Sequence, residues 1–367
     1  MSSVPRSFSE HLAHWFPRPR LLLPPAAGID ISDASIKWIV LEEGREGKQI
    51  RSYGEVALPS GIVVNGVVQN VQMLAGVLHD VKGKLGSIEH AHAALPEEAA
   101  FVFSMQVPPS SRREQILSMI EFELEGRVPI PPSASVYDFD CIEKHADGEE
   151  IGVVVFPREV AQSYVDSFSA AGLRLLSLEL EARSIARAVS RSHIDEPIAL
   201  LVDFGRQRTG LAAIKRGVPI FTTTVGVGSE LIDKAIVEKL SLSPEELDAF
   251  KFEEGLLAKE GKNSAGLEVI SGAASALADE VAKHYHYWDT RRNERGERMT
   301  PLERVYLLGG GANLKGLGDY IASRVQAEVV RPNVWENVCS FGEYIPPIDR
   351  RASLQFATAI GLALRSV

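Results

Sequence analysis

Short apolar runs separated by turns dominate the first part of the chain. The apolar runs lie at Ile31, 36–41 and 56–58, with turn-forming residues at 32–35 and 44–47. Runs of this length, bounded by Gly, Ser and Asp, are typical of β-strands joined by hairpins. The pattern predicts an antiparallel meander, followed by a helix over 71–85.

The pattern changes near residue 95. Residues 101–107 alternate like a strand, and Ser111 and Glu114 have the spacing of a capping box for a helix that carries Ile116, Ile120 and Leu124 on one face. A short buried strand over 153–156 and a helix over 158–171, ended by Gly172, are expected next. Residues 95–175 are therefore predicted to form an inserted small α+β unit.

The strand-rich pattern then begins again, after a helix over 181–190. The expected strands are 198–202, 211–214 and 220–224, and the expected helices are 230–240, 244–250 and 269–292. The first strand of each half ends in an aspartate, Asp30 or Asp203, and leads into a hairpin. This weak internal repeat predicts an α/β protein with two related domains.

Composition narrows the class of protein. The 367 residues include 45% hydrophobic and 24% charged residues, which suits two or three compact units. A net charge of −10 argues against general binding to nucleic acid or anionic lipid. Cys141 and Cys339 are the only cysteines, and no apolar run reaches the roughly 20 residues needed to span a bilayer. We expect a cytoplasmic protein that reaches membranes only through partners.

Residues 1–24 form an unusual leader. Ser7 and Glu10 have capping-box spacing, and an apolar helical face precedes Pro17. That face consists of Phe8, Leu12, Trp15 and Phe16. Two interpretations stay open: an arm docked on its own domain, or a helix that binds a partner. Few lysines and arginines lie within the helix, so a protein partner ranks above a membrane.

Two turns carry the candidate chemistry. The first offers Asp30, Ser32, Ser35 and Lys37, and the second offers Asp203, Gly205, Gln207 and Thr209. Facing turns of this kind could present backbone N–H groups to phosphates, while Asp30 and Asp203 hold a hydrated Mg²⁺ ion. Taken singly, each turn is ordinary hairpin chemistry, and only the pair points to phosphate binding.

A third motif follows an apolar strand near residue 305. Gly309, Gly310 and Gly311 precede Asn313, and a helix is expected to begin near Leu314. Glycine runs allow the backbone to approach a flat ligand such as adenine or its ribose. No G-x-G-x-x-G follows the first strand and no G-x-x-x-x-G-K-[ST] is present, so the commonest nucleotide-binding folds are not supported.

With these three motifs in this order, the chain resembles the actin–sugar kinase–Hsp70 superfamily. Within it, the chain is similar to the PilM family of type IV pilus assembly, which is related to the division protein FtsA. Family-like stretches are Ala94-Leu95-Pro96-Glu97-Glu98, 116–124, 156–172 and 355–364. The resemblance implies an actin-like (ribonuclease H-like) fold with an inserted SHS2-type subdomain. The expected parts are a leader (1–24), the first part of domain I (25–94), the inserted subdomain (95–175), a connecting helix (176–196), domain II (197–340) and a C-terminal helix that returns to domain I (341–367).

The same resemblance implies a function. It implies a cytoplasmic scaffold that binds ATP and Mg²⁺, docks the cytoplasmic N-terminal peptide of a PilN-like inner-membrane protein, and links the pilus inner-membrane platform to its motor. The peptide is expected beside residues 95–175. One position departs from the family pattern, because Ser32 stands where glycine is usual. Glu179 and Glu181 are the only candidates to position a water, and no residue is clearly placed as a base. Slow or absent hydrolysis is therefore expected.

Three alternatives remain open. An FtsA-like cytoskeletal protein is expected to end in an amphipathic membrane helix, whereas 359–365 reads as a core helix. A secretion-system relative would continue into a membrane span. A small-molecule kinase needs a catalytic carboxylate that we could not locate. The triplet Asp203-Phe204-Gly205 does not indicate a protein kinase, because no H-R-D loop accompanies it.

Overall fold

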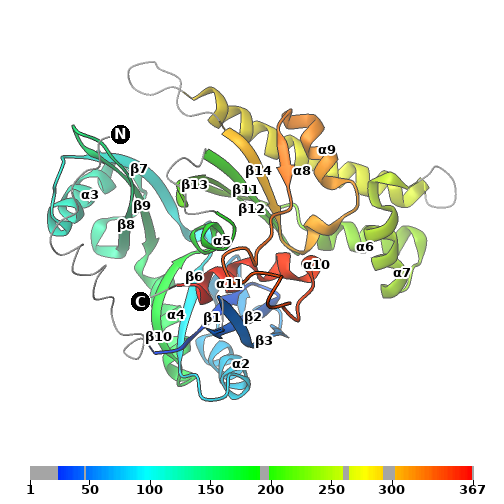
Figure 1. The fold of residues 1–367 in the computed structure, drawn as a ribbon, viewed down its shortest axis with the longest axis horizontal. Coiled ribbons are helices and arrows are strands. Elements are labelled where there is room, and N and C mark those ends of the chain that lie inside the picture. Colours follow the sequence, from blue (N-terminus) through cyan, green and yellow to red (C-terminus); the bar gives the residue numbers. More distant parts are fainter. Residues whose placement is uncertain (1–23, 45–46, 191–197, 259–263, 292–301, 366–367) are drawn as a thin grey trace.

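The computed structural model describes residues 24–44, 47–190, 198–258, 264–291 and 302–365. The predicted leader helix therefore lies outside the described residues. Two five-stranded sheets form the centres of two halves, with helices around them and a third, smaller sheet at one side (Figure 1).

The two large sheets share one topology. The first has the order β10-β6-β1-β2-β3, and the second has β13-β12-β11-β14-β15. In each sheet an antiparallel meander of three strands is extended by two parallel strands. The strands of the first sheet are β1 (Ala26–Ile31), β2 (Ser35–Glu43), β3 (Lys48–Ala57), β6 (His90–Leu95) and β10 (Arg174–Leu180). Those of the second are β11 (Ile198–Phe204), β12 (Thr209–Lys215), β13 (Val218–Val225), β14 (Leu302–Leu308) and β15 (Glu328–Val330).

This shared order explains the internal repeat seen in the sequence. Asp30 lies near the end of β1 and Asp203 near the end of β11, which are equivalent central strands. Both meanders were predicted, and the structure confirms them. The parallel strands β6, β10 and β15 were not predicted.

The third sheet belongs to the inserted unit. It has the order β7-β9-β8, formed by β7 (Phe101–Val107), β8 (Ser135–Lys144) and β9 (Glu149–Pro157). Helix α3 (Arg113–Arg127) packs on it through Ile116, Ile120 and Leu124, as predicted. The prediction extended this unit to residue 175, whereas α4 (Arg158–Ala170) packs on α2 (Val71–Lys84) and β10 pairs with β6 in the first sheet.

Three predicted helix starts were displaced, and one of them is that of α8 (Ser264–Thr290), which begins before the predicted residue 269. The Gln115 side chain accepts a hydrogen bond from the Arg112 N–H (2.9 Å), while the Ser111 hydroxyl donates to the Pro108 carbonyl (2.8 Å). The cap is thus one residue later than the predicted Ser111–Glu114 pair. A 3-10 turn (Gly310–Asn313) that includes the last two glycines precedes α9 (Leu317–Val325), so the helix begins three residues later than expected.

Helices α5 (Glu181–Val189) and α11 (Ala357–Ala363) pack together between the two halves (Figure 1). Helix α11 also packs on β1 of the first sheet. The remaining helices are α6 (Ser229–Leu240), α7 (Pro244–Ala249), α8 (Ser264–Thr290) and α10 (Arg350–Ser353). Among the described residues, none of these helices combines the length and apolarity of a membrane span.

Two glycines allow this central contact. A Cβ atom added to Gly361 would lie 1.8 Å from the Ser184 carbonyl oxygen of α5, and one added to Gly28 of β1 would lie 2.2 Å from the Ala359 carbonyl oxygen. Both contacts are with backbone atoms, which cannot rotate away. Helices α5 and α11 can therefore approach this closely only because residue 361 lacks a side chain.

We predict that Gly361→Ala lowers the free energy of unfolding by about 1–3 kcal/mol, the usual cost of overpacking a rigid contact. Gly76→Ala in α2 is the matched control, because an added Cβ there meets no atom within 4 Å. That control should be neutral or stabilising by about 0.4–1 kcal/mol. Urea denaturation of both variants measures the difference. Equal midpoints would contradict the role assigned to Gly361.

Candidate functional site

A cleft with a volume of about 800 Å³ opens between the two large sheets. The β1–β2 turn forms one wall and the β11–β12 turn faces it from the other half. The loop after β14, the start of α5, one side of α6 and the start of α11 also contribute to the lining.

Nine of the twelve predicted site residues line this cleft. They are Asp30, Ser32, Ser35, Lys37, Asp203, Gly205, Gln207, Gly309 and Gly310. The structure thus brings together three motifs that are separated by more than a hundred residues in the sequence.

The other three predicted residues support the cleft without lining it. Thr209 is fully buried and its hydroxyl donates to the Val227 carbonyl (2.6 Å). A Cβ on Gly311 would lie 2.5 Å from the ring of Phe204, so this glycine serves packing. The Asn313 side-chain amide donates to the Arg351 carbonyl (3.0 Å), which holds the glycine loop against α10.

Ser32 uses its hydroxyl within its own turn. Its Oγ donates to the Ser35 carbonyl (3.0 Å) and accepts from the Ser35 N–H (3.1 Å). Lys37 Nζ donates to Ser35 Oγ (2.9 Å) and lies 3.4 Å from Glu55 Oε1. The Ser32 hydroxyl therefore stabilises its own turn, at a position where the family pattern has glycine. In this conformation the O–H is not presented to the cleft.

Several lining residues were given no role by the sequence motifs. The most notable are Asp33, Glu97, Glu98, Arg208 and Lys251. Glu97 and Glu98 follow β6, the unpredicted strand beside β1, so their place at the cleft depends on sheet order. The stretch around them, 94–98, resembles the family, and this resemblance was the signal in the sequence that could have identified them as site residues.

Carboxyl groups crowd the centre of the cleft. Loss of solvation, together with the nearby Asp30, raises the pKa of Asp203 to about 6. Loss of solvation also raises the pKa of Asp30, although the charge of Lys37 opposes this. A cation between Asp30 and Asp203 would offset their repulsion, and carboxylate oxygens are suitable ligands for Mg²⁺.

Glu97 and Glu181 form a second, hydrogen-bonded carboxyl pair. Burial raises the pKa of Glu97 to about 7 and that of Glu181 well above its usual range. Glu97 Oε1 also accepts from the Ala182 N–H at the start of α5 (2.8 Å). Glu181 thus lines the cleft, but as part of a pair that holds a proton near neutral pH.

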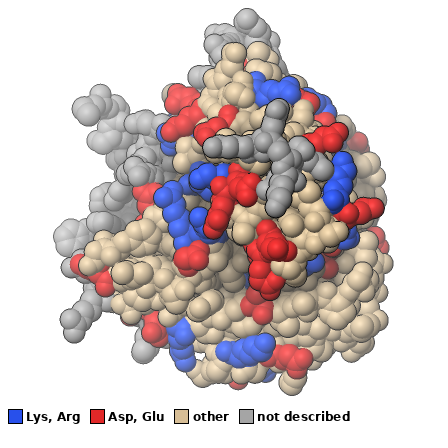
Figure 2. All heavy atoms as spheres, turned by 90° about the vertical axis from the view of Figure 1, so that its right-hand side faces the viewer, with Lys and Arg blue, Asp and Glu red and all other residues tan. Residues whose placement is uncertain are grey.

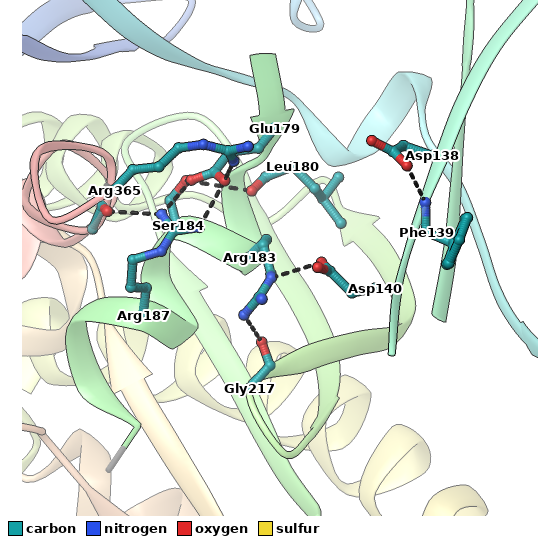
Figure 3. Close-up of polar contacts among 11 residues, drawn as sticks. Asp138, Phe139, Asp140, Glu179, Leu180, Arg183, Ser184, Arg187, Gly217 and Arg365 are labelled. Carbon is teal, nitrogen blue, oxygen red and sulfur yellow. Dashed lines mark hydrogen bonds and ion pairs between the residues drawn. The ribbon is translucent and has the colours of Figure 1, made fainter. Parts of the chain in front are cut away.

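Glu179, the other candidate to position a water, lies outside this cleft. It accepts hydrogen bonds from Arg187, Ser184 and Arg365, and Figure 3 shows these side chains converging on it. Burial alone would raise the pKa of Glu179, but the two guanidinium groups lower it. Glu179 is therefore a structural anchor between β10, α5 and the end of α11.

A second cavity of about 640 Å³ adjoins this anchor. It lies between β8, β10 and α5, and its polar lining includes Asp138 and Asp140 of β8 and Arg183 of α5, which points toward Asp140 (Figure 3). Arg183 donates to Asp140 (2.9 Å) and to the Gly217 carbonyl (2.7 Å). Apolar lining comes from Leu95, Val136, Val154, Phe156, Leu178, Leu180 and Leu364.

The distribution of charge on the surface is relevant to the expectation that the protein does not bind nucleic acid in general. Figure 2 shows acidic and basic side chains interspersed on one face rather than a continuous basic area. This view does not extend to the far face, so the prediction still rests on the net charge of −10.

Comparison with solved structures identifies the fold. The chain is similar to a structure described as the PilM-PilN type IV pilus biogenesis complex, with 19% identity, a TM-score of 0.74, and coverage of 93% of this chain and 98% of that one. It is also similar to ethanolamine utilization protein EutJ from Carboxydothermus hydrogenoformans (17% identity, TM-score 0.52, coverage 94% and 93%). MreB5 of Spiroplasma citri bound to ADP matches with 12% identity, a TM-score of 0.52, and coverage of 92% and 94%.

These identities are low and establish the architecture alone. The protein has an actin-like two-domain α/β fold, as the sequence predicted. A family model described as type IV pilus assembly protein PilM matches residues 28–367. Because that match covers most of the chain, the protein belongs to the PilM family of type IV pilus assembly proteins.

Proposed function

We propose that the interdomain cleft binds ATP with Mg²⁺, and that the protein is a cytoplasmic ATP-binding scaffold of the type IV pilus machinery. The observation that carries the proposal is the placement of Asp30 and Asp203 at equivalent strand ends, facing one cleft that Gly309 and Gly310 also line. MreB5 of Spiroplasma citri, which has the same fold, was solved with ADP and with AMPPNP.

The charge of the cleft supports a metal-bound nucleotide. Phosphates alone would meet Asp30 and Asp203, whereas Mg²⁺ would shield both carboxylates and bridge to phosphate oxygens. Lys37 provides a cation on the same wall. We therefore assign the metal to Asp30 and Asp203, directly or through water, and the phosphates to the two turns.

Hydrolysis is expected to be slow. The Ser32 hydroxyl is engaged within its turn, and Glu181 shares a proton with Glu97 instead of being free to act as a base. Binding without rapid turnover suits a scaffold whose nucleotide is a structural ligand.

We predict that Mg²⁺ with ATP raises the melting temperature, because a ligand that binds only the folded state stabilises it by about 2.7 kcal/mol at 100 times its Kd. Asp203→Ala should remove the Mg²⁺-dependent part of this shift. Asp80→Ala, on the exposed face of α2, is the control and should behave like the unmodified protein. A melting temperature that ignores millimolar ATP and Mg²⁺ would contradict the proposal.

Binding should also release protons. Asp203 has a raised pKa of about 6, so it is about half protonated at pH 6 and must lose that proton when a cation binds. Calorimetric titration with pre-formed Mg-ATP, in buffers of different ionisation enthalpy, should show proton release at pH 6 that declines by pH 8. Asp203→Ala should release fewer protons at pH 6. Proton release that does not change with pH would show that the metal is elsewhere.

We further propose that the second cavity docks the cytoplasmic N-terminal peptide of a PilN-like inner-membrane protein. The PilM-PilN structure supports a partner of this class. Among the described residues, β8 pairs only with β9 and is an edge strand of its sheet, and an extended peptide could add to its other edge. The apolar lining beside it could accept alternate side chains. Such docking would recruit the protein to the inner membrane, where it could link the pilus platform to its motor.

Leu178→Ala tests the docking site, because this half-buried residue lines the second cavity. We predict that affinity for a synthetic N-terminal peptide of the partner falls about tenfold, or about 1.4 kcal/mol. Leu231→Ala, at an exposed leucine of α6, is the matched control. Fluorescence anisotropy measures both.

Deletion of residues 1–24 separates the two open interpretations of the leader. Peptide affinity that survives the deletion but falls with Leu178→Ala supports the cavity. Affinity lost with the leader alone would place the docking site there instead.

A further inference from the structure

Arg208 connects the two halves of the molecule at the mouth of the cleft. It lies in the β11–β12 turn of the second half, yet its guanidinium contacts two carboxylates of the first half. Nη1 donates to Asp33 Oδ2 (2.9 Å) and Nη2 to Asp33 Oδ1 (3.2 Å). Nε pairs with Glu98, which follows β6.

Asp33 is held rigidly for this contact. Its two carboxylate oxygens also accept the N–H groups of Asn65 (2.8 Å) and Gly66 (2.9 Å). The side chain is only 9% exposed. Each Asp33 oxygen therefore accepts one backbone and one guanidinium hydrogen bond, so Asp33 is already committed to protein partners.

The bidentate geometry makes this contact stronger than an ordinary surface ion pair. Planar fork contacts between arginine and a carboxylate are among the strongest charge-assisted hydrogen bonds. The Arg208 and Glu98 side chains are 20% and 19% exposed, so solvent screens them only partly. The two carboxylates raise the pKa of Arg208, against the effect of its burial.

Arg206 in the same turn offers a contrast. Its side chain is 67% exposed, and its ion pair is with Glu230 of the same half at 3.7 Å. Of these two arginines, Arg208 is the one that crosses the cleft. Asp33 and Glu98 already engage three of the five N–H groups of the Arg208 guanidinium without a ligand.

We propose that Arg208, Asp33 and Glu98 form a clasp that holds the β1–β2 turn and the β11–β12 turn together without a bound nucleotide. The clasp aligns the two ligand-facing turns in advance. It also makes Arg208 a positioning residue that acts through the turns, rather than a phosphate ligand.

Hydrogen–deuterium exchange of the nucleotide-free protein tests the clasp. In Arg208→Gln, peptides that cover residues 30–37 and 203–210 should exchange at least about tenfold faster, because loss of a partly buried ion pair frees both turns to open locally. Arg208→Lys should give an intermediate rate, since a single ammonium cannot form the fork. Glu98→Gln should accelerate exchange less than Arg208→Gln, because Asp33 remains paired.

Arg206→Gln is the matched control, because it removes the same charge from the same turn without crossing the cleft. Its exchange in both peptides should match that of the unmodified protein. Asp33→Asn is not informative, because Asp33 also binds two backbone N–H groups. No nucleotide enters the measurement, so its outcome does not depend on ATP binding.

Unchanged exchange in both Arg208→Gln and Glu98→Gln would overturn the clasp. A second result would also overturn it: weaker binding of Mg-ATP by Arg208→Gln with exchange like that of the unmodified protein would make Arg208 a direct ligand of the phosphates.

Discussion

The backbone contact between α5 and α11 is the constraint on which the rest of the structure depends. Gly361 lets α11 approach the Ser184 carbonyl of α5, and Gly28 lets it lie directly on β1. With both helices seated between the two large sheets, the ends of β1 and β11 face a common cleft. The geometry of the candidate site therefore rests first on backbone packing at Gly361 and Gly28, and polar contacts such as that of Glu97 with the Ala182 N–H add to it.

Electrostatics determines what this cleft can hold. The cleft contains four carboxyl groups that the surrounding protein solvates poorly, namely those of Asp30, Asp203, Glu97 and Glu181. This loss of solvation raises the pKa of all four. A divalent cation would offset the repulsion between these carboxylates, and a cation that also binds phosphate would favour binding of a nucleotide in the cleft. At the mouth, Arg208 pairs with two further lining carboxylates, Asp33 and Glu98, and connects the halves.

Local signals in the sequence were read correctly where the structure depends on local chemistry. The meanders, the aspartates at strand ends and most helices follow from short-range patterns, and they are present. Apart from the helix cap that was predicted one residue too early, at Ser111, errors arose where a distant partner decides the outcome. Arg208 and Asp33 are 175 residues apart, so no spacing rule could pair them, and Arg208 was overlooked between the predicted Gln207 and Thr209. Gly311 was assigned to a ligand, and in the structure a Cβ at this position would lie 2.5 Å from the ring of Phe204, a contact that the sequence did not indicate.

The central claim is that the cleft binds a nucleotide through a metal held by Asp30 and Asp203. Isothermal titration calorimetry with the slowly hydrolysed analogue AMPPNP tests it most directly, in matched titrations with Mg²⁺ and with EDTA. The account predicts saturable binding near one nucleotide per chain with Mg²⁺, and binding at least about tenfold weaker, or about 1.4 kcal/mol, when EDTA removes the metal. Equal affinity under both conditions, or no binding in either, would contradict it.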